Sequence, residues 1–364
     1  MLPNPTALMS HDLAFLERLL DAPGPSGFET RPSRVWKEEA GGFAERVWTD
    51  VHGNAYAAVG EERRPRVMLA GHMDEIGIQV TWINEEGFLY FDGIGGWDPQ
   101  VLVGQRVRIL GRDGDVPGVI GKKPIHLMQP EERKKVSEIR DLWVDVGAAS
   151  GDEVRELGIR VGDPAVLATS FQHLAGDRVV SRAIDNRVGA YIVLEALRLL
   201  AEDPAPVAGC VAVATVQEEI GYSGGGARSA AFTLEPDAAL VVDVTFATDV
   251  PDVPKKEVGE HKLGGGPVLS RGSATNAAVF DRLVVEADRR EIPYSIQAAP
   301  RATRTDADGI FLVRSGIPTG LVSIPNRYMH SPSEMVSASD LHRSAELLAA
   351  FVRSLDAESS FIPG

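Results

Sequence analysis

The sequence is poor in the residues that many binding chemistries require. Its 364 residues include a single cysteine, Cys210, so intrachain disulfides and cysteine-held zinc or iron–sulfur sites are excluded. Lys and Arg number 37 against 52 Asp and Glu; the resulting formal net charge of −15 argues against nucleic acid or anionic membranes as partners. No apolar run approaches the roughly 18 residues that span a bilayer, and the first residues do not resemble a signal peptide. We therefore expect a cytoplasmic protein in which any metal is held by His, Asp and Glu.

The order of apolar segments predicts an α/β fold with an inserted module. Strands buried on both faces of a sheet are continuously apolar, and such runs occur at residues 66–70, 207–216, 238–242 and 320–324. Amphipathic patterns predict helices over residues 10–20, 186–200, 276–290 and 339–355. Short alternating segments instead predict a small β-rich, barrel-like module. We expect a mixed open sheet with helices on both faces (residues 1–74 and 176–364), interrupted by a β-rich domain over residues 75–175.

Acidic and histidine side chains gather where the predicted sheet strands end. Ligands of open α/β sheets bind outside the carboxyl ends of the strands, so residues at these positions are candidates for a common site. The candidates are His72, Asp74, Asp185, Glu218, Glu219, Asp243 and His330.

Each candidate has a plain structural alternative when it is taken alone. A His-x-Asp turn is often a surface pair, and adjacent Glu218 and Glu219 are typical of a solvated strand end. Asp185 alone suits the N-terminal cap of the following helix, Asp243 alone suits a turn, and His330 alone suits an exposed loop. Their shared position in the predicted fold favours a site over these alternatives.

A two-metal site explains why these residue types occur together. Two divalent cations about 3.5–4 Å apart need one shared carboxylate and terminal ligands on each side. Imidazole and carboxylate oxygen without thiolate suit zinc, cobalt or manganese. If Glu218 and Glu219 lie where a strand gives way to a loop, one can bind metal while the other acts as a general base. Asp74, two residues after His72, can accept its N–H and orient the imidazole.

The ordered motifs of the chain resemble those of the M42 family of metallo-aminopeptidases, the glutamyl and deblocking aminopeptidase type, whose relatives have also carried a cellulase label. The resemblance covers nearly the whole chain. It rests on Ala-Pro-Gly-Pro-Ser-Gly at residues 22–27, Ala-Gly-His-Met-Asp-Glu-Ile-Gly at 70–77, Lys-Pro-Ile-His at 123–126, Ala-Ile-Asp-Asn-Arg at 183–187, Glu-Glu-Ile-Gly at 218–221, Val-Asp-Val-Thr at 242–245 and His-Ser-Pro-Ser-Glu at 330–334.

The resemblance implies a zinc-exopeptidase-like fold and a hydrolase that removes N-terminal residues from peptides. It implies two divalent metal ions per subunit, with zinc as the first choice and cobalt or manganese as alternatives. The implied ligands are Asp185 as the bridge, His72 and Asp243 on one metal, and Glu219 and His330 on the other. Glu218 is then the general base for a metal-activated water, and Asp74 orients His72. The family also implies assembly through the β-rich module, as dimers that build a dodecamer.

One segment departs from the family pattern, because the Thr-Asp-Ala at residues 305–307 follows Arg301, Ala302, Thr303 and Arg304 rather than small, glycine-rich residues. The two arginines are either surface charges or line the pocket for the substrate's first side chain and favour Asp or Glu there. Three other functions remain alternatives: a carboxypeptidase or dipeptidase of the same chemistry, a glycosidase, and a non-catalytic scaffold. Glycoside hydrolysis needs two carboxyl groups and no metal, so loss of activity on chelation would reject it.

Overall fold

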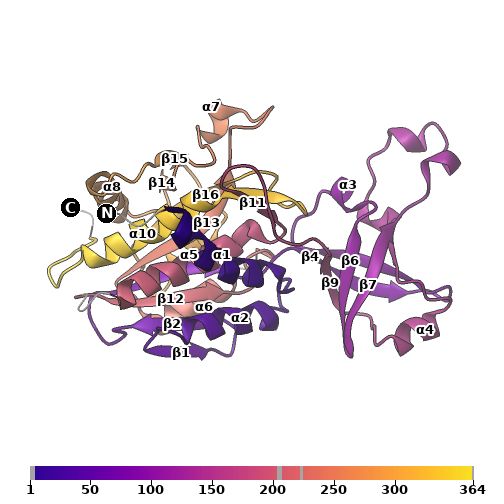
Figure 1. Cartoon of the computed structure of the whole chain (residues 1–364), viewed down its shortest axis with the longest axis horizontal. Coiled ribbons are helices and arrows are strands. Elements are labelled where there is room, and N and C mark those ends of the chain that lie inside the picture. The colour runs from indigo at the N-terminus through magenta and orange to yellow at the C-terminus, as the bar shows by residue number, and fades with distance from the viewer. Residues whose placement is uncertain (1–4, 203–206, 222–223, 363–364) are drawn as a thin grey trace.

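The computed structural model describes residues 5–202, 207–221 and 224–362. They form an open mixed sheet with helices on both faces and, beside it, a small closed β-barrel (Figure 1). This arrangement confirms the fold class expected from the apolar segments. Among the described helices, none is long and apolar enough to cross a membrane.

The central sheet has eight strands, and its four middle strands run parallel. The order across the sheet is β1, β2, β12, β3, β13, β16, β14, β15. The middle strands β12, β3, β13 and β16 pair in parallel, whereas β2 is antiparallel to both of its neighbours and β14 is antiparallel to β16. The bounds are β1 Arg46–Thr49, β2 Ala55–Val59, β3 Arg66–His72, β12 Gly209–Thr215, β13 Ala238–Phe246, β14 Val268–Gly272, β15 Ser295–Ala299 and β16 Thr319–Asn326.

Apolar side chains alternate between the two faces of the parallel strands. In β12, Cys210 and Ala212 pack into one core and Val211 and Val213 into the other. The first core includes helices α1 (Pro5–Asp21), α2 (Thr30–Ala40), α5 (Ile184–Ala201), α8 (Ala277–Arg289) and α10 (Ala338–Arg353). The second core includes α6 (Gly225–Leu234) and α9 (Asp306–Ile310). Because both faces are covered, these strands are apolar at nearly every position.

The β-rich segment closes into a barrel that lies to one side of the sheet (Figure 1). Its strands follow the order β4, β5, β8, β7, β6, β9 around a separate apolar core. The bounds are β4 Gly77–Ile83, β5 Phe88–Ile94, β6 Arg106–Gly111, β7 Gly114–Gly121, β8 Trp143–Asp145 and β9 Pro164–Leu167, with short helices α3 Pro99–Leu102 and α4 Gly151–Glu156 and a 3₁₀ turn Ile125–Leu127. The charged segment over residues 130–141 forms two 3₁₀ turns, Glu132–Lys134 and Ile139–Asp141. Its side chains are mostly exposed, so no buried apolar face stabilises a longer helix.

Two strands are longer than the sequence predicted. β3 continues through Gly71 to His72, and β13 continues through Asp243 to Phe246, because their parallel neighbours extend the ladders to Thr215 and Asn326. The prediction also missed α2, α6 and β14. It missed α7 (Lys255–Val258) and a small antiparallel sheet of β10 (Gln172–His173), β11 (Arg178–Ser181) and β17 (Glu334–Ser337) as well.

Candidate active site

The structure brings all seven candidate side chains to the carboxyl edge of the four parallel strands. They come from the end of β3 (His72, Asp74), the turn after β12 (Glu218, Glu219), β13 (Asp243), the loop after β16 (His330) and the start of α5 (Asp185). The start of α5 approaches β3 closely because residue 71 is glycine. A Cβ there would stand 2.5 Å from the carbonyl carbon of Gly189 in α5.

Two groups of ligand atoms share Asp185. Nε2 of His72 lies 3.4 Å from Oδ1 of Asp185 and 3.8 Å from Oδ1 of Asp243. Nε2 of His330 lies 3.4 Å from Oδ2 of Asp185 and 3.2 Å from Oε2 of Glu219. Within each group the ligand atoms lie within 4.8 Å of one another. The two oxygens of one carboxylate therefore face different groups, as a bridging ligand requires.

The position of Asp185 is set by its main chain. Asp185 and Asn186 have non-helical backbone dihedrals, and it is Oδ1 of Asn186, rather than the side chain of Asp185, that accepts from the N–H of Gly189 in α5, at 3.1 Å. Nδ2 of Asn186 donates to the carbonyl of Val242 in β13 at 2.7 Å. The buried carboxylate of Glu334 accepts from the main-chain N–H of Asp185 at 3.0 Å and from that of His330 at 2.8 Å. One carboxylate thus holds two of the candidate ligands in place.

The carboxylate of Asp74 holds the turn after β12 in the same way, by accepting hydrogen bonds from main-chain N–H groups. Its Oδ2 accepts from Oγ of Ser26 at 2.5 Å and from the N–H of Glu219 at 3.1 Å, and its Oδ1 accepts from the N–H of Glu218 at 3.2 Å. Oδ1 also lies 3.3 Å from Nδ1 of His72, as an ion pair rather than an aligned hydrogen bond. Asp74 therefore fixes both glutamates and faces the first imidazole.

The second imidazole is oriented by the barrel segment. Nδ1 of His330 lies 2.8 Å from the carbonyl oxygen of Gly96, which follows β5. A carbonyl only accepts, so Nδ1 carries a proton, and Nε2 faces Asp185 and Glu219. Glu218 belongs to neither group of ligand atoms, although its Oε2 lies 3.7 Å from Nε2 of His72.

Burial and mutual repulsion raise the pKa of most of these carboxylates. Burial is the largest cause for both glutamates, and it raises the pKa of Glu218 to about 10 and that of Glu219 to about 7. At Asp185, burial is outweighed by contacts from His330 and His72, which lower its pKa to about 2. The neighbouring carboxylates in turn outweigh burial at His330 and raise its pKa to about 11.

The charges of the site fit divalent cations. Four carboxylates (Asp185, Glu218, Glu219 and Asp243) face two imidazoles, and Oε1 of Glu219 is buried without a hydrogen-bond partner among the described residues. Burial also raises the pKa of Asp243 well above its usual range. A cation at each group would supply the missing positive charge and a partner for the orphaned oxygen.

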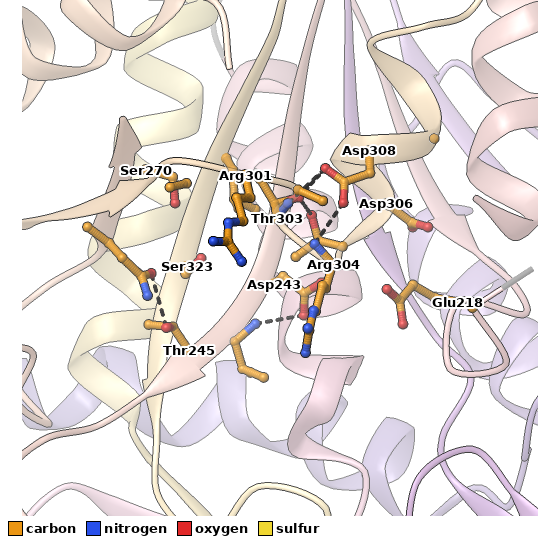
Figure 2. Close-up of a pocket in the computed structure, with 18 of the residues that line it drawn as sticks. Glu218, Asp243, Thr245, Ser270, Arg301, Thr303, Arg304, Asp306, Asp308 and Ser323 are labelled. Atoms are coloured by element: carbon orange, nitrogen blue, oxygen red, sulfur yellow. Dashed lines mark hydrogen bonds between the residues drawn. The ribbon is translucent and has the colours of Figure 1, made fainter. Parts of the chain in front are cut away.

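The two groups of ligand atoms open into a pocket of about 1340 Å³. Another part of its wall is the loop between β15 and α9, whose Arg301 and Arg304 side chains extend into the pocket (Figure 2). Asp306 at the start of α9 also lines the pocket. It accepts a hydrogen bond from Oγ1 of Thr215 at 2.5 Å, and burial is the main cause that raises its pKa to about 6.

Sequence reasoning missed the residues that hold the candidates in place. Ser26, Glu334 and Asp306 all lie within quoted motifs, so their motif positions were a signal, although no role was assigned to them. The carbonyl of Gly96 had no signal at all, because a main-chain acceptor does not depend on side-chain type.

Comparisons with known proteins agree in family and in fold. A family described as M42 glutamyl aminopeptidase matches residues 53–347. The lysyl aminopeptidase of Pyrococcus furiosus is 35% identical over 94% of this chain and 97% of its own length. The crystal structure of a TET aminopeptidase from a Thaumarchaeota archaeon of marine sediment covers 96% of this chain and 97% of its own, at 35% identity and a TM-score of 0.91. The Pyrococcus horikoshii TET1 peptidase, described as assembling into a tetrahedron or a large octahedral shell, covers 94% of this chain and 100% of its own, at 31% identity and a TM-score of 0.83.

Proposed function

Because this chain belongs to the M42 family and is an aminopeptidase, we propose that it releases N-terminal residues from peptides with two divalent cations at the carboxyl edge of its sheet. The proposed ligands are Asp185 as the bridge, His72 and Asp243 for one cation, and Glu219 and His330 for the other. The single observation that carries this proposal is that the two oxygens of Asp185 face separate groups of ligand atoms.

The donor set supports zinc, with cobalt or manganese as alternatives. Each group combines one imidazole with carboxylate oxygens and no thiolate, which suits these borderline cations better than copper(I) or calcium. The acceptor for His330 at Gly96 and the carboxylate facing His72 are the usual outer partners of metal-binding histidines. When bound, the cations supply Lewis-acid chemistry: they polarise the scissile carbonyl and acidify water.

We assign the proton transfers to Glu218. Its carboxylate lies at the pocket wall and belongs to neither group of ligand atoms. Two bound cations would lower its raised pKa, and the ionised carboxylate could then accept a proton from water and return one to the leaving amine. Asp74 acts through other residues, because it holds the main chain of Glu218 and Glu219 and orients His72.

Metal analysis of purified variants tests the ligand assignment. His72→Ala and His330→Ala should each lower the bound metal below two ions per chain, because each removes a terminal ligand from one group. His173→Ala is the matched control, since His173 is exposed and belongs to neither group. Two ions per chain in both His72→Ala and His330→Ala would contradict the assignment.

The peptide terminus that is recognised is tested with capped substrates. We expect cleavage of free-amine peptides with or without C-terminal amidation, and no cleavage after N-acetylation. The opposite result would favour the carboxypeptidase alternative.

We also propose that the chain assembles into homo-oligomers through residues 75–175, with a dodecamer as the expected form. The shells described for the Pyrococcus horikoshii relative support assembly. The barrel also exposes large apolar side chains, which favour an interface: Trp82, Val119, Ile125, Leu127 and Val136. Light scattering on the full chain should show a large assembly, and a monomer at micromolar concentration would reject it.

A further inference from the structure

The turn after β12 is held through its main chain by side chains from three other segments. Four successive N–H groups of this turn each donate to a side-chain oxygen. The donors and their acceptors, in chain order, are Val216 with Asn54 at 3.2 Å, Gln217 with Glu29 at 3.2 Å, Glu218 with Asp74 at 3.2 Å and Glu219 with Asp74 at 3.1 Å. The proposed general base and one proposed metal ligand therefore lie on a backbone that is fixed from outside the turn.

Gln217 adopts a backbone conformation that is unfavourable without support. Its φ is 61°, in the left-handed region, where the Cβ of a residue other than glycine crowds the following carbonyl oxygen. Successive side chains of a strand point to opposite faces, yet Glu218 and Glu219 both line the pocket. The left-handed residue before them turns the chain out of β12 and allows both to do so. Such a conformation persists only where surrounding contacts determine it.

Three contacts fix Gln217, and one of them holds its main-chain N–H. Oε1 of its side chain lies 2.8 Å from Nε2 of the exposed His52. Its carbonyl oxygen lies against Gly225, where a Cβ would stand 2.6 Å away. Its N–H donates to Oε1 of Glu29, a side chain that is only 8% exposed. Glu29 is therefore the buried polar group that orients the peptide between Val216 and Gln217.

The side chain of Glu29 is not used to cap a helix. Glu29 stands at the N-terminal cap position of α2, but its side chain makes no capping hydrogen bond. Its Oε1 accepts instead from the N–H of Gly27 at 2.7 Å and from that of Gln217, which links the segment before α2 to the turn after β12. Glu29 is not among the described residues that line the pocket, so its influence on catalysis passes through Gln217.

We propose that Glu29 is a positioning residue for Glu218 and acts through the main chain of Gln217. This inference rests on the proposed function, because it presumes that Glu218 transfers the protons. The acceptor oxygen of Glu29 keeps the left-handed turn in place, and the turn keeps the carboxylate of Glu218 within reach of the proton it transfers. A displacement of about 1 Å at a reacting group lowers the rate by about 100-fold.

Two substitutions of equal length separate the acceptor oxygen from the charge and the volume of Glu29. Glu29→Gln keeps an acceptor oxygen, whereas Glu29→Met fills a similar space without one. With a fluorogenic leucine amide, Glu29→Met should lower kcat by about 10- to 100-fold and leave KM within about threefold, with two ions per chain still bound. Glu29→Gln should restore kcat to within about threefold of the unmodified enzyme. Glu29→Ala gives the same acceptor-free comparison if the thioether prevents folding.

A double-mutant cycle shows whether the effect passes through the general base. The Glu218→Gln background has no base to position, so adding Glu29→Met should lower the residual kcat by less than about twofold. A merely structural role of Glu29 would lower kcat by the same factor in both backgrounds, and that result would overturn the proposal.

Asp163→Leu is the matched control for a general loss of stability. Asp163 is also 8% exposed, and its Oδ2 accepts from the main-chain N–H of Arg160 at 2.8 Å. It lies between α4 and β9 of the barrel and does not line the pocket. Urea unfolding should show a loss of stability in Asp163→Leu and in Glu29→Met, whereas kcat should fall only in Glu29→Met. An equal fall of kcat in both variants would overturn the proposal.

The remaining outcomes separate this inference from the function on which it rests. Near-normal kcat in Glu29→Met, or a kcat in Glu29→Gln as low as that in Glu29→Met, would overturn the positioning role while the assignment of Glu218 stood. Near-normal kcat in Glu218→Gln alone would overturn the assignment of the base and the inference together. Failure of the metal-loaded enzyme to cleave any aminoacyl amide would overturn the aminopeptidase function itself.

Discussion

Asp74 and Glu75 are neighbours in the sequence, yet their buried side chains join charge clusters of opposite kinds. Asp74 faces the acidic cluster, defined here as His72, Asp185, Glu218, Glu219, Asp243 and His330. Glu75 joins the balanced cluster, the name used here for Glu75 with Arg182 and Arg187, in which opposite charges pair directly. Its Oε1 accepts from Arg187 at 2.8 Å and its Oε2 accepts from Arg182.

In the balanced cluster one carboxylate pairs with two guanidinium groups, and main-chain carbonyls accept most of the remaining N–H groups of Arg187. Besides Glu75, Arg187 donates to the carbonyls of Leu19, Ala22 and Met73, which ties the end of α1 and the segment after β3 to α5. These carbonyls include orphan acceptors at a helix C-terminus, where a cation is favoured. No external ion is needed to complete this arrangement.

The pKa shifts of Glu75 and Glu218 have opposite directions, although burial raises the pKa of both. At Glu75, burial favours the neutral form, but Arg182 and Arg187 outweigh it and the pKa is lowered. At Glu218, burial is reinforced by Asp243 and Asp306, and the pKa is raised to about 10. The sign of the neighbouring charges therefore distinguishes a structural ion cluster from one that is built for an external cation.

Replacing Glu218, the carboxylate of the acidic cluster that is not assigned as a metal ligand, should have the largest effect on activity. Glu218→Gln should lower kcat by about 100- to 10,000-fold, because it removes the group that transfers protons. Two ions per chain should remain bound, since Glu218 belongs to neither group of ligand atoms. Steady-state kinetics with metal analysis checks both points, and near-normal kcat would show that the role of Glu218 is misassigned.

The matching change in the balanced cluster should affect stability instead. Glu75→Gln leaves two buried guanidinium groups without their counter-charge, which should lower the free energy of unfolding by about 3–5 kcal/mol. Urea unfolding measures this loss, and chelation should not alter its size. At temperatures where the variant stays folded, its metal content should be unchanged. A loss of metal would show that the balanced cluster also supports the metal ligands.

The acidic cluster could be predicted from the sequence largely because its members follow apolar runs. Continuous apolarity indicates parallel strands, and the ends of parallel strands meet at one edge. That argument needs only local patterns, so it found the candidates His72, Asp243 and His330 although they come from three distant segments.

The balanced cluster has no such local signal. Glu75 contacts Arg182 and Arg187 across 107 and 112 residues of chain, and nothing in the spacing indicates that pairing. Helix α2 was missed for a related reason, because it buries few apolar side chains besides Trp36. Helix α6 begins with Gly225 and Gly226, which indicate a loop rather than a helix.

Across pH 5 to 8, the pH dependence of the free energy of unfolding should come from the acidic cluster and not from the balanced cluster. The folded pKa of Glu219 is raised to about 7, so its contribution is full below pH 4.5 and is lost as the pH rises to 7. The raised pKa of His330 changes stability in the same direction above pH 6.5. The pKa of Glu75 is lowered, so its contribution is lost only as the pH falls below about 4.5 and adds no slope here.

The metal-free protein should therefore lose several kcal/mol of stability between pH 5 and 8, at about 1.4 kcal/mol per shifted pKa unit. Glu218, whose pKa is raised to about 10, adds to this loss in the same direction. Urea unfolding of the metal-free and metal-loaded forms at several pH values measures the difference. Bound cations favour the ionised carboxylates, so the loss should shrink in the metal-loaded form. Equal slopes in the two forms would place the titrating groups outside the acidic cluster.

The smallest effect should come from replacing Ser26, which contacts both Asp74 and Glu75. Its N–H donates to the main-chain carbonyl of Glu75 at 3.2 Å, and its hydroxyl donates to Oδ2 of Asp74 at 2.5 Å. Ser26→Ala removes only the second contact, so activity should fall by about three- to tenfold, below the 10–100-fold typical of a direct outer partner of a metal ligand. Unfolding free energy should change by about 1 kcal/mol. The two measurements together identify the cluster that Asp74 belongs to. A loss of stability with unchanged kcat would place Asp74 with Glu75 in the structural cluster, whereas a fall in kcat beside the small loss of stability keeps it with the metal site.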